Sequence, residues 1–176
     1  IYLGKNKFKA WLNLSGNAWS AATEIEPFFP TEPPNRITVT DLLGNGTACI
    51  VWSSELPAYS RTPMRYIDLM GGIKPHIMRS QENGMGKKTV VEYKSSTYFY
   101  LKDKLAGTPW ITKLPFPVQV VSKTIVTERV TNVRFAVEYS YHHGYYDQAE
   151  REFRGFGRVE QLDTESFDVF EKTGAS

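Results

Sequence analysis

An alternation of apolar and polar residues, which is typical of a β-strand, is the strongest pattern along the chain. It is clearest over residues 133–142, where every second position is apolar: Val133, Phe135, Val137, Tyr139 and Tyr141. Residues 118–130 come before this segment, with Thr131-Asn132 between, so the pattern predicts a long β-hairpin. We expect its apolar side to be core, against an interior or a neighbouring layer, so that Phe135→Lys or Tyr139→Lys would cost a few kcal/mol.

Shorter strands are predicted before this hairpin, at residues 8–14, 18–25, 36–40, 48–52, 64–70, 76–82 and 88–93. The glycine-rich turn at residues 41–47 joins two of them into a hairpin, and Asn83-Gly84 provides the positive φ angles of a second tight turn. The prolines of residues 27–34 predict a loop, because proline has no N–H to give to a β-ladder. Residues 53–63 contain prolines and serines and are the best candidate for a domain boundary.

Helical patterns are weak along the chain. The aromatic run at residues 98–100 precedes what we expect to be a polar turn at residues 102–107, and only residues 148–152 offer a short helical pattern. Beyond the long hairpin, glycines stand beside aromatic residues over residues 144–157. This arrangement predicts bends in a curved sheet, where large rings lie over positions without a side chain.

The composition agrees with a β-rich globular protein. Hydrophobic residues make up 41% of the chain, aromatic residues 14% and charged residues 23%, which excludes a disordered or coiled-coil chain. No run approaches the roughly 20 apolar residues that span a bilayer, so we expect no direct membrane insertion. The net charge of +2 is too small to indicate a nucleic-acid binder. Because the chain begins at Ile1 rather than at a methionine, we expect it to be a piece of something longer.

Candidate metal ligands are few. The single cysteine, Cys49, excludes an intrachain disulfide and a cysteine-based zinc site. Adjacent His142 and His143 would point to opposite faces of a strand, so they would not hold one ion together. Residues 41–49 have the outline of a calcium loop, but only Asp41 and Asn45 supply side-chain oxygens there. We expect a metal-free turn, and no metal, cofactor or catalytic residues elsewhere.

Two other function classes remain open. Glu-x-Glu at residues 24–26 and 150–152, with Ser95-Ser96-Thr97, has elements of an ADP-ribosyltransferase, although the order of the serines and threonine departs from that pattern. No Gly-x-Ser-x-Gly nucleophile motif is present. A free-standing β-sandwich could instead bind carbohydrate or protein through exposed aromatic residues such as Trp110 or Tyr145.

Several blocks follow one another along the chain, at residues 41–54, 65–72, 74–76, 114–118, 141–147 and 150–157. In this order they resemble the B component of insecticidal toxin complexes and the related Salmonella-type plasmid virulence protein, SpvB. The resemblance covers nearly the whole chain, although the first 30 residues match only in outline. The positions that carry the structural motif are Asp41, Gly44, Asn45, Gly46, Trp52, Tyr141, Gly144, Tyr146, Asp147, Phe153, Gly155, Phe156 and Gly157.

In that family the B component and its C partner look like a hollow shell of long β-strands, built from Rhs or YD-type repeats, which encloses a toxic C-terminal polypeptide. A β-propeller of the FG-GAP kind closes one end. The resemblance implies an all-β chain: residues 1–56 would be the last propeller blade, and residues 57–176 would begin the curved shell with long antiparallel hairpins.

The function implied by this resemblance is structural and non-enzymatic. The segment would help to form the shell and link it to the propeller, within a secreted, extracellular toxin complex of a bacterium. Its partners would be the remainder of the B and C shell, the pore-forming A component through the propeller, and the enclosed toxic region. The resemblance implies no cofactor and no nucleic acid.

Overall fold

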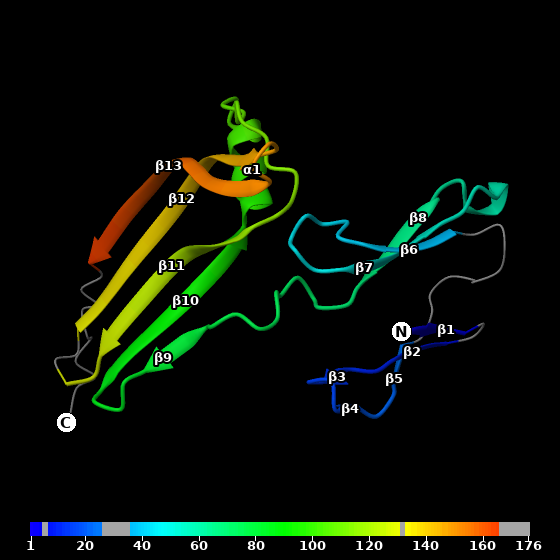
Figure 1. The fold of residues 1–176 in the computed structure, drawn as a ribbon, viewed down its shortest axis with the longest axis horizontal. Coiled ribbons are helices and arrows are strands. Elements are labelled where there is room, and N and C mark those ends of the chain that lie inside the picture. The colour runs from blue at the N-terminus through cyan, green and yellow to red at the C-terminus, as the bar shows by residue number, and fades with distance from the viewer. Residues whose placement is uncertain (5–6, 26–35, 131–132, 166–176) are drawn as a thin grey trace, which may run out of the picture. The chain divides into compact units, whose positions relative to one another are not determined.

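The computed structural model describes residues 1–4, 7–25, 36–130 and 133–165. The chain divides into two compact units (Figure 1): unit 1 contains residues 1–42 and 47–71, and unit 2 contains residues 43–46 and 72–176. Strands dominate both units and all of them pair antiparallel, so the predicted all-β class with long antiparallel hairpins is confirmed. The boundary between residues 56 and 57 stays a prediction.

Unit 1 begins with very short strands. A three-stranded sheet has the order β1 (Tyr2–Leu3), β2 (Phe8–Ala10) and β5 (Thr23–Ile25), while β3 (Asn13–Leu14) pairs with β4 (Ala18–Trp19) in a separate hairpin. The predicted strands at residues 8–14 and 18–25 are therefore each divided in two. The Ser20 hydroxyl accepts the Leu12 N–H, and such side-chain bonds compete with ladder pairing. The predicted loop at residues 27–34 lies outside the described residues.

A second sheet in unit 1 confirms the predicted hairpin at residues 36–52. Its order is β6 (Arg36–Thr40), β7 (Cys49–Ser53) and β8 (Met64–Asp68). A short 3-10 helix, η1 (Pro57–Tyr59), lies in the connection between β7 and β8. Ile50 and Trp52 of β7 are fully buried and pack with Phe8 of β2. The Trp52 ring meets Tyr59 edge to face at 5.0 Å. Apolar burial therefore joins the two sheets of this unit into one core.

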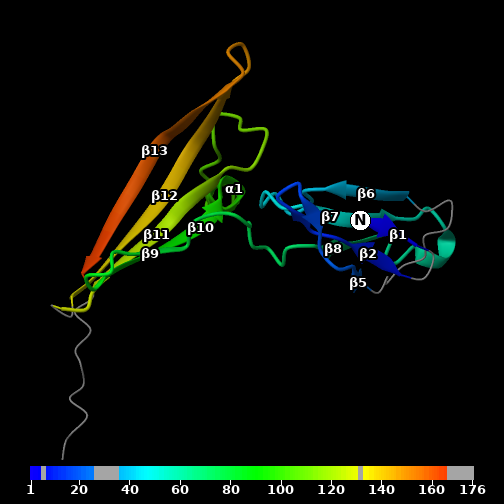
Figure 2. The ribbon, with the colours of Figure 1, turned by 60° about the horizontal axis from the view of Figure 1, so that its bottom comes forward.

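Unit 2 is built on a five-stranded antiparallel sheet whose long strands run side by side (Figures 1 and 2). The order is β13 (Glu152–Glu165), β12 (Val133–Asp147), β11 (Gln119–Glu128), β10 (Lys87–Ser95) and β9 (Ser80–Glu82). The long hairpin of β11 and β12 is confirmed. The predicted strand at residues 76–82 shortens to three residues. Register shifts interrupt β10 at Glu92/Tyr93 and β12 at Tyr145/Tyr146.

A helix, α1 (Ser96–Leu105), contains the aromatic run and replaces most of the polar turn predicted at residues 102–107. Ser96, Phe99 and Asp103 are its buried residues, and their spacing of three and four places them on one helical face. Lys102 and Lys104 lie in the last turn, where positive charge is favourable. The weak helical pattern at residues 148–152 does not form a helix: residues 148–151 form a turn and Glu152 begins β13. The Asp147 carboxylate accepts the backbone N–H groups of Ala149 and Glu150 in this turn.

The two faces of β12 differ from the sequence-based expectation. Phe135 lies on the apolar side of the alternation but is 45% exposed, whereas Ala136 on the opposite side is 7% exposed. Ala136 stands opposite Ile125 of β11 in the register. The expectation that Phe135 is core is therefore wrong for this chain. Alternation identified the strand correctly, but burial varies along its apolar side: Phe135 is exposed, whereas Val137, Tyr139 and Tyr141 are partly buried.

This difference gives a paired test on neighbouring residues of one strand. We expect Ala136→Lys to lower the free energy of unfolding by about 2–4 kcal/mol, because it forces a long charged side chain into a filled site. Phe135→Lys should cost about 1 kcal/mol or less, because the ring is nearly half exposed and the lysine head can reach water. Urea unfolding followed by far-UV circular dichroism measures both. Equal costs, or the reverse order, would contradict the assignment of the faces.

Candidate functional site

The candidate site is the place where α1 and the segment at residues 107–118 cover the end of β12. Gly144 of β12 is central to it, because a Cβ atom there would lie 2.8 Å from Trp110 Cζ3 and 2.9 Å from Leu114 Cδ2. Such distances are shorter than van der Waals contact allows, so only glycine fits. The Thr112 hydroxyl donates to the Gly144 carbonyl at 2.9 Å, which fixes the segment against the strand.

Aromatic rings continue from Trp110 across the sheet to the helix. Phe156 of β13 lies 6.0 Å from Trp110 and 4.9 Å from Tyr141, and Tyr141 meets Phe99 of α1 at 5.4 Å, all between ring centroids. Such edge-on and tilted pairs add to the free energy gained by burial. The Tyr141 hydroxyl donates to the Val121 carbonyl at 2.9 Å. Burial raises the pKa of Tyr141, which further favours the protonated phenol that donates this bond.

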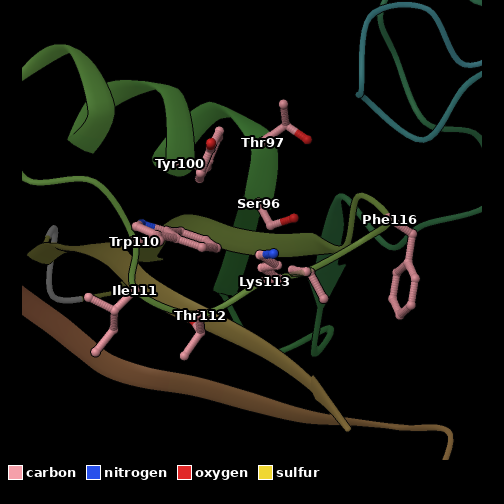
Figure 3. Close-up of a pocket in the computed structure, with 9 residues that line it drawn as sticks. Ser96, Thr97, Tyr100, Trp110, Ile111, Thr112, Lys113 and Phe116 are labelled. Carbon is pink, nitrogen blue, oxygen red and sulfur yellow. The ribbon is translucent and has the colours of Figure 1, made fainter. Parts of the chain in front are cut away.

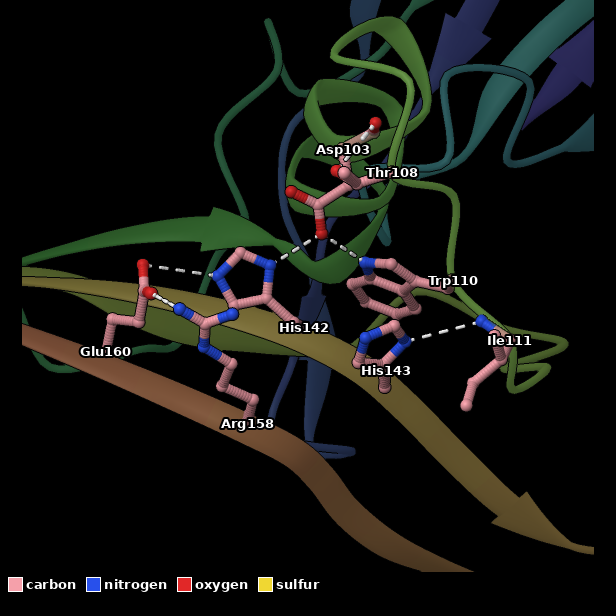
Figure 4. A network of polar contacts seen from close by, with 8 residues as sticks. All are labelled: Asp103, Thr108, Trp110, Ile111, His142, His143, Arg158 and Glu160. Atoms are coloured by element: carbon pink, nitrogen blue, oxygen red, sulfur yellow. Dashed lines mark hydrogen bonds and ion pairs between the residues drawn. The ribbon is translucent and has the colours of Figure 1, made fainter.

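A polar network runs beside the rings (Figure 4). Oδ2 of Asp103 accepts the Trp110 indole N–H at 2.6 Å and lies 2.6 Å from His142 Nδ1. On the other side of the imidazole, His142 Nε2 lies 3.5 Å from Glu160 Oε2, and Glu160 also pairs with Arg158. One carboxylate on α1 thus joins the covering segment to β12, and a second carboxylate approaches the same ring from β13.

The neighbouring histidine serves a different element. His143 Nδ1 accepts the Ile111 N–H at 3.3 Å, and its φ of 58° is a left-handed backbone conformation within β12. His142 and His143 therefore contact separate partners. Within the described ranges, no group of three or more histidine, cysteine or acidic residues could hold a metal ion.

A cavity of about 400 Å³ lies between the start of α1 and the covering segment (Figure 3). Its lining residues are Ser96, Thr97, Tyr100, Trp110, Ile111, Thr112, Lys113, Leu114 and Phe116. The Ser96 hydroxyl accepts the Val118 N–H at 3.0 Å, so it has a structural partner. The walls combine aromatic and aliphatic side chains with hydroxyl groups and one lysine.

The arrangement resembles a catalytic dyad only in part. A histidine held by an aspartate can accept a proton from a nucleophile when a hydroxyl or thiol faces its other nitrogen. Here the other nitrogen of His142 faces the carboxylate of Glu160. In the ADP-ribosyltransferase alternative, Glu24 forms an ion pair with Lys7, and Glu152 forms one with Arg154. These are contacts between exposed side chains, and the two glutamates lie on the strands β5 and β13.

The predicted motif residues in and beside the glycine turn are divided between the two units. Gly44 and Gly46 have φ angles of 62° and 76°, and Lys74 Nζ donates to the Gly46 carbonyl at 2.7 Å. The Asn45 carbonyl accepts from the Gln119 side chain, and these loop residues belong to unit 2. Asp41 and the buried Trp52 belong to unit 1.

The remaining predicted motif residues lie at the β12–β13 turn. Tyr146 meets Phe116 at 5.2 Å and Phe153 meets Phe156 at 5.5 Å between ring centroids. Gly155 has a φ of 94° beside the register shift, and a Cβ on Gly157 would lie 3.2 Å from His143 Cβ. The structure therefore brings part of the motif together in one cluster: Tyr141, Gly144 and Phe156.

Sequence reasoning missed Phe99 and Asp103, and the alternative of a carbohydrate- or protein-binding module expected Trp110 to be exposed. That expectation for Trp110 is wrong, because the residue is 9% exposed and hydrogen-bonded. The signal for the other two was present in the helical spacing of Ser96, Phe99 and Asp103. Tyr145 is exposed, as expected.

The close approach at Gly144 gives a sharp prediction. We expect Gly144→Ala to lower the free energy of unfolding by about 1–3 kcal/mol, because the added methyl collides with Trp110 and Leu114. Leu114→Ala removes one of the colliding groups, so the same Gly144→Ala change should cost less in that background. Denaturant unfolding of both single variants and of the double variant measures the coupling. Strictly additive costs would contradict a direct collision.

Comparisons with known proteins agree on one family. The family described as insecticide toxin TcdB middle/N-terminal region matches residues 14–175. Among solved structures, TcdB2-TccC3-Cdc42 matches with a TM-score of 0.79 and 28% identity, and a Photorhabdus luminescens Tc holotoxin pore carrying a mutation in TccC3 matches with a TM-score of 0.80 and 28% identity. Each match covers 93% of this chain. No curated protein matches the chain.

The matched region is a small part of its relatives. The chain spans 8% of the length of each of these solved chains. In the described part of the chain, no helix has the length and apolar character needed to cross a membrane. Because the family match extends over nearly the whole sequence, the chain belongs to the insecticide toxin TcdB middle/N-terminal region family, a structural part of the B component of a toxin complex.

Proposed function

We propose that this chain is a non-enzymatic strip of wall in the hollow β-shell of a toxin-complex B component, where it helps to enclose a toxic C-terminal polypeptide. The observation that carries the proposal is the five-stranded antiparallel sheet of unit 2, whose strands β12 and β13 are 15 and 14 residues long. In the described part of this sheet, β9 and β13 each have a paired neighbour on one side. Their other edges can accept further strands.

A wall of paired strands suits containment for a physical reason. Each strand satisfies the backbone N–H and C=O groups of its neighbours, so the wall needs no solvent for its hydrogen bonds and can present different faces to water and to cargo. The two faces of β12 already differ. One exposes Phe135, and the other carries the Lys123–Glu138 ion pair, whose partners lie opposite each other in the register.

The candidate site would stiffen this wall. The helix and the covering segment cap the end of the β12–β13 hairpin through Trp110, Asp103 and Gly144. In the proposed assembly residues 1–56 form the last propeller blade and residues 57–176 begin the Rhs-like shell. The pore-forming A component is then a partner through the propeller, and the complex is secreted by a bacterium.

The wall is tested in the B component carrying this chain, co-expressed with its C partner. Leu162 on the edge strand β13 is 61% exposed, and Leu162→Pro removes a backbone N–H there. We expect the C-terminal toxic polypeptide to resist added protease in the parent complex and to be digested in the proline variant. Leu162→Lys is the matched control, because it keeps the N–H, and it should preserve resistance.

Two results would overturn the proposal. One is a Leu162→Pro complex of unchanged size, with altered backbone pairing in β13 shown by hydrogen exchange, that still protects the toxic polypeptide as the parent does. The other is transfer of labelled ADP-ribose by the purified 176-residue chain that is lost in Glu152→Gln. The second result would make the chain an enzyme rather than a wall segment.

A further inference from the structure

One buried polar atom of the candidate site has no hydrogen-bond partner among the described residues: His142 Nε2. The other ring nitrogen, Nδ1, lies 2.6 Å from Asp103 Oδ2. Because an ionised carboxylate only accepts hydrogen bonds, Nδ1 carries the proton of the neutral ring. Nε2 then offers a lone pair, and a second acceptor, Glu160 Oε2, lies 3.5 Å from it.

A proton on Nε2 would resolve this mismatch. It would turn the lone pair into an N–H donor aimed at Glu160, and the imidazolium would then connect a carboxylate on α1 to a carboxylate on β13 (Figure 4). Charge-assisted hydrogen bonds of this kind are stronger than neutral ones. The side chains of His142 and Asp103 are 18% and 11% exposed, so water weakens the contact only in part.

The charged groups near the ring are two carboxylates and one guanidinium. Asp103 comes from α1, and Glu160 comes from β13. Arg158 of β13 stands opposite His142 in the register and opposes the added charge, but its guanidinium pairs with Glu160. The covering segment contributes Trp110, which is neutral and donates to the same oxygen of Asp103.

We propose that protonation of His142 joins α1 to β13, because the charged ring contacts Asp103 on one side and Glu160 on the other, and that this tightens the end of the sheet when the surroundings become acidic. Histidine is the side chain that ordinarily exchanges its charge between pH 5 and 8. The protonated ring makes one contact more in the folded chain than the neutral ring does. We therefore expect the folded chain with a protonated His142 ring to hold α1 and β13 together more tightly than the folded chain with a neutral ring. The inference does not depend on the proposed wall function.

The test compares variants at matched pH. His142→Asn keeps a side-chain N–H donor for Asp103 but has no second nitrogen to protonate. We expect the melting temperature of the parent chain to exceed that of His142→Asn by about 2–4 °C more at pH 5.5 than at pH 8. Glu160→Gln should remove most of the same pH-dependent difference. Hydrogen exchange should show slower exchange of the α1 amides in the parent than in His142→Asn at pH 5.5.

His143→Asn is the matched control, because asparagine tolerates the positive φ of that position and its side-chain oxygen can accept the Ile111 N–H. It should keep the pH response of the parent. The proposal is overturned if the parent and His142→Asn differ equally at both pH values. It is also overturned if the ring ¹⁵N resonances of His142 show no proton gained at Nε2 between pH 8 and 5. The resonance measurement remains decisive even where a variant does not fold.

Discussion

The contact of the Trp110 indole with the bare backbone of Gly144 is the constraint on which the organisation of unit 2 depends. It brings the covering segment within a few ångströms of β12, closer than any side chain on that residue would permit. The indole N–H is then directed at Asp103 of α1. One aromatic residue therefore sets the distance of the segment from the sheet and the position of the helix along it. This junction combines a packing constraint with a directional hydrogen bond.

The position of Asp103 follows from the same contact. A carboxylate with 7% of its residue surface exposed would be costly without partners, because burial disfavours the charged form. Trp110 and His142 both meet its Oδ2 atom, and these contacts offset that cost. Removing either partner would leave the buried Asp103 carboxylate with a single hydrogen bond to compensate its charge. We therefore expect the two contacts to be cooperative. The helix is thus fixed by charge as well as by the burial of Phe99.

The positions of strands could be predicted well from the sequence where local preferences within the strand or its turn determined them. Alternation located β12, and the glycine turn located the hairpin of β6 and β7, because both depend on local backbone preferences. The helix α1 was missed, since Tyr98, Phe99 and Tyr100 favour strands individually and only tertiary burial selects the helical face of Ser96, Phe99 and Asp103. The exposure of the Phe135 side chain could not be predicted for the same reason, because it too depends on tertiary packing.

The candidate site was accessible to sequence reasoning only in its glycines and aromatic residues. A glycine among aromatic residues indicates a close approach, and Gly144 shows one with Trp110, which is 34 positions earlier in the chain. The partners of His142 come from two further elements, α1 and β13, and no local pattern connects them. A histidine between two carboxylates therefore emerges only from the tertiary structure. In a wall segment, a change in the charge of such a residue would act on the junction that holds the helix to the sheet and would leave the paired strands unchanged.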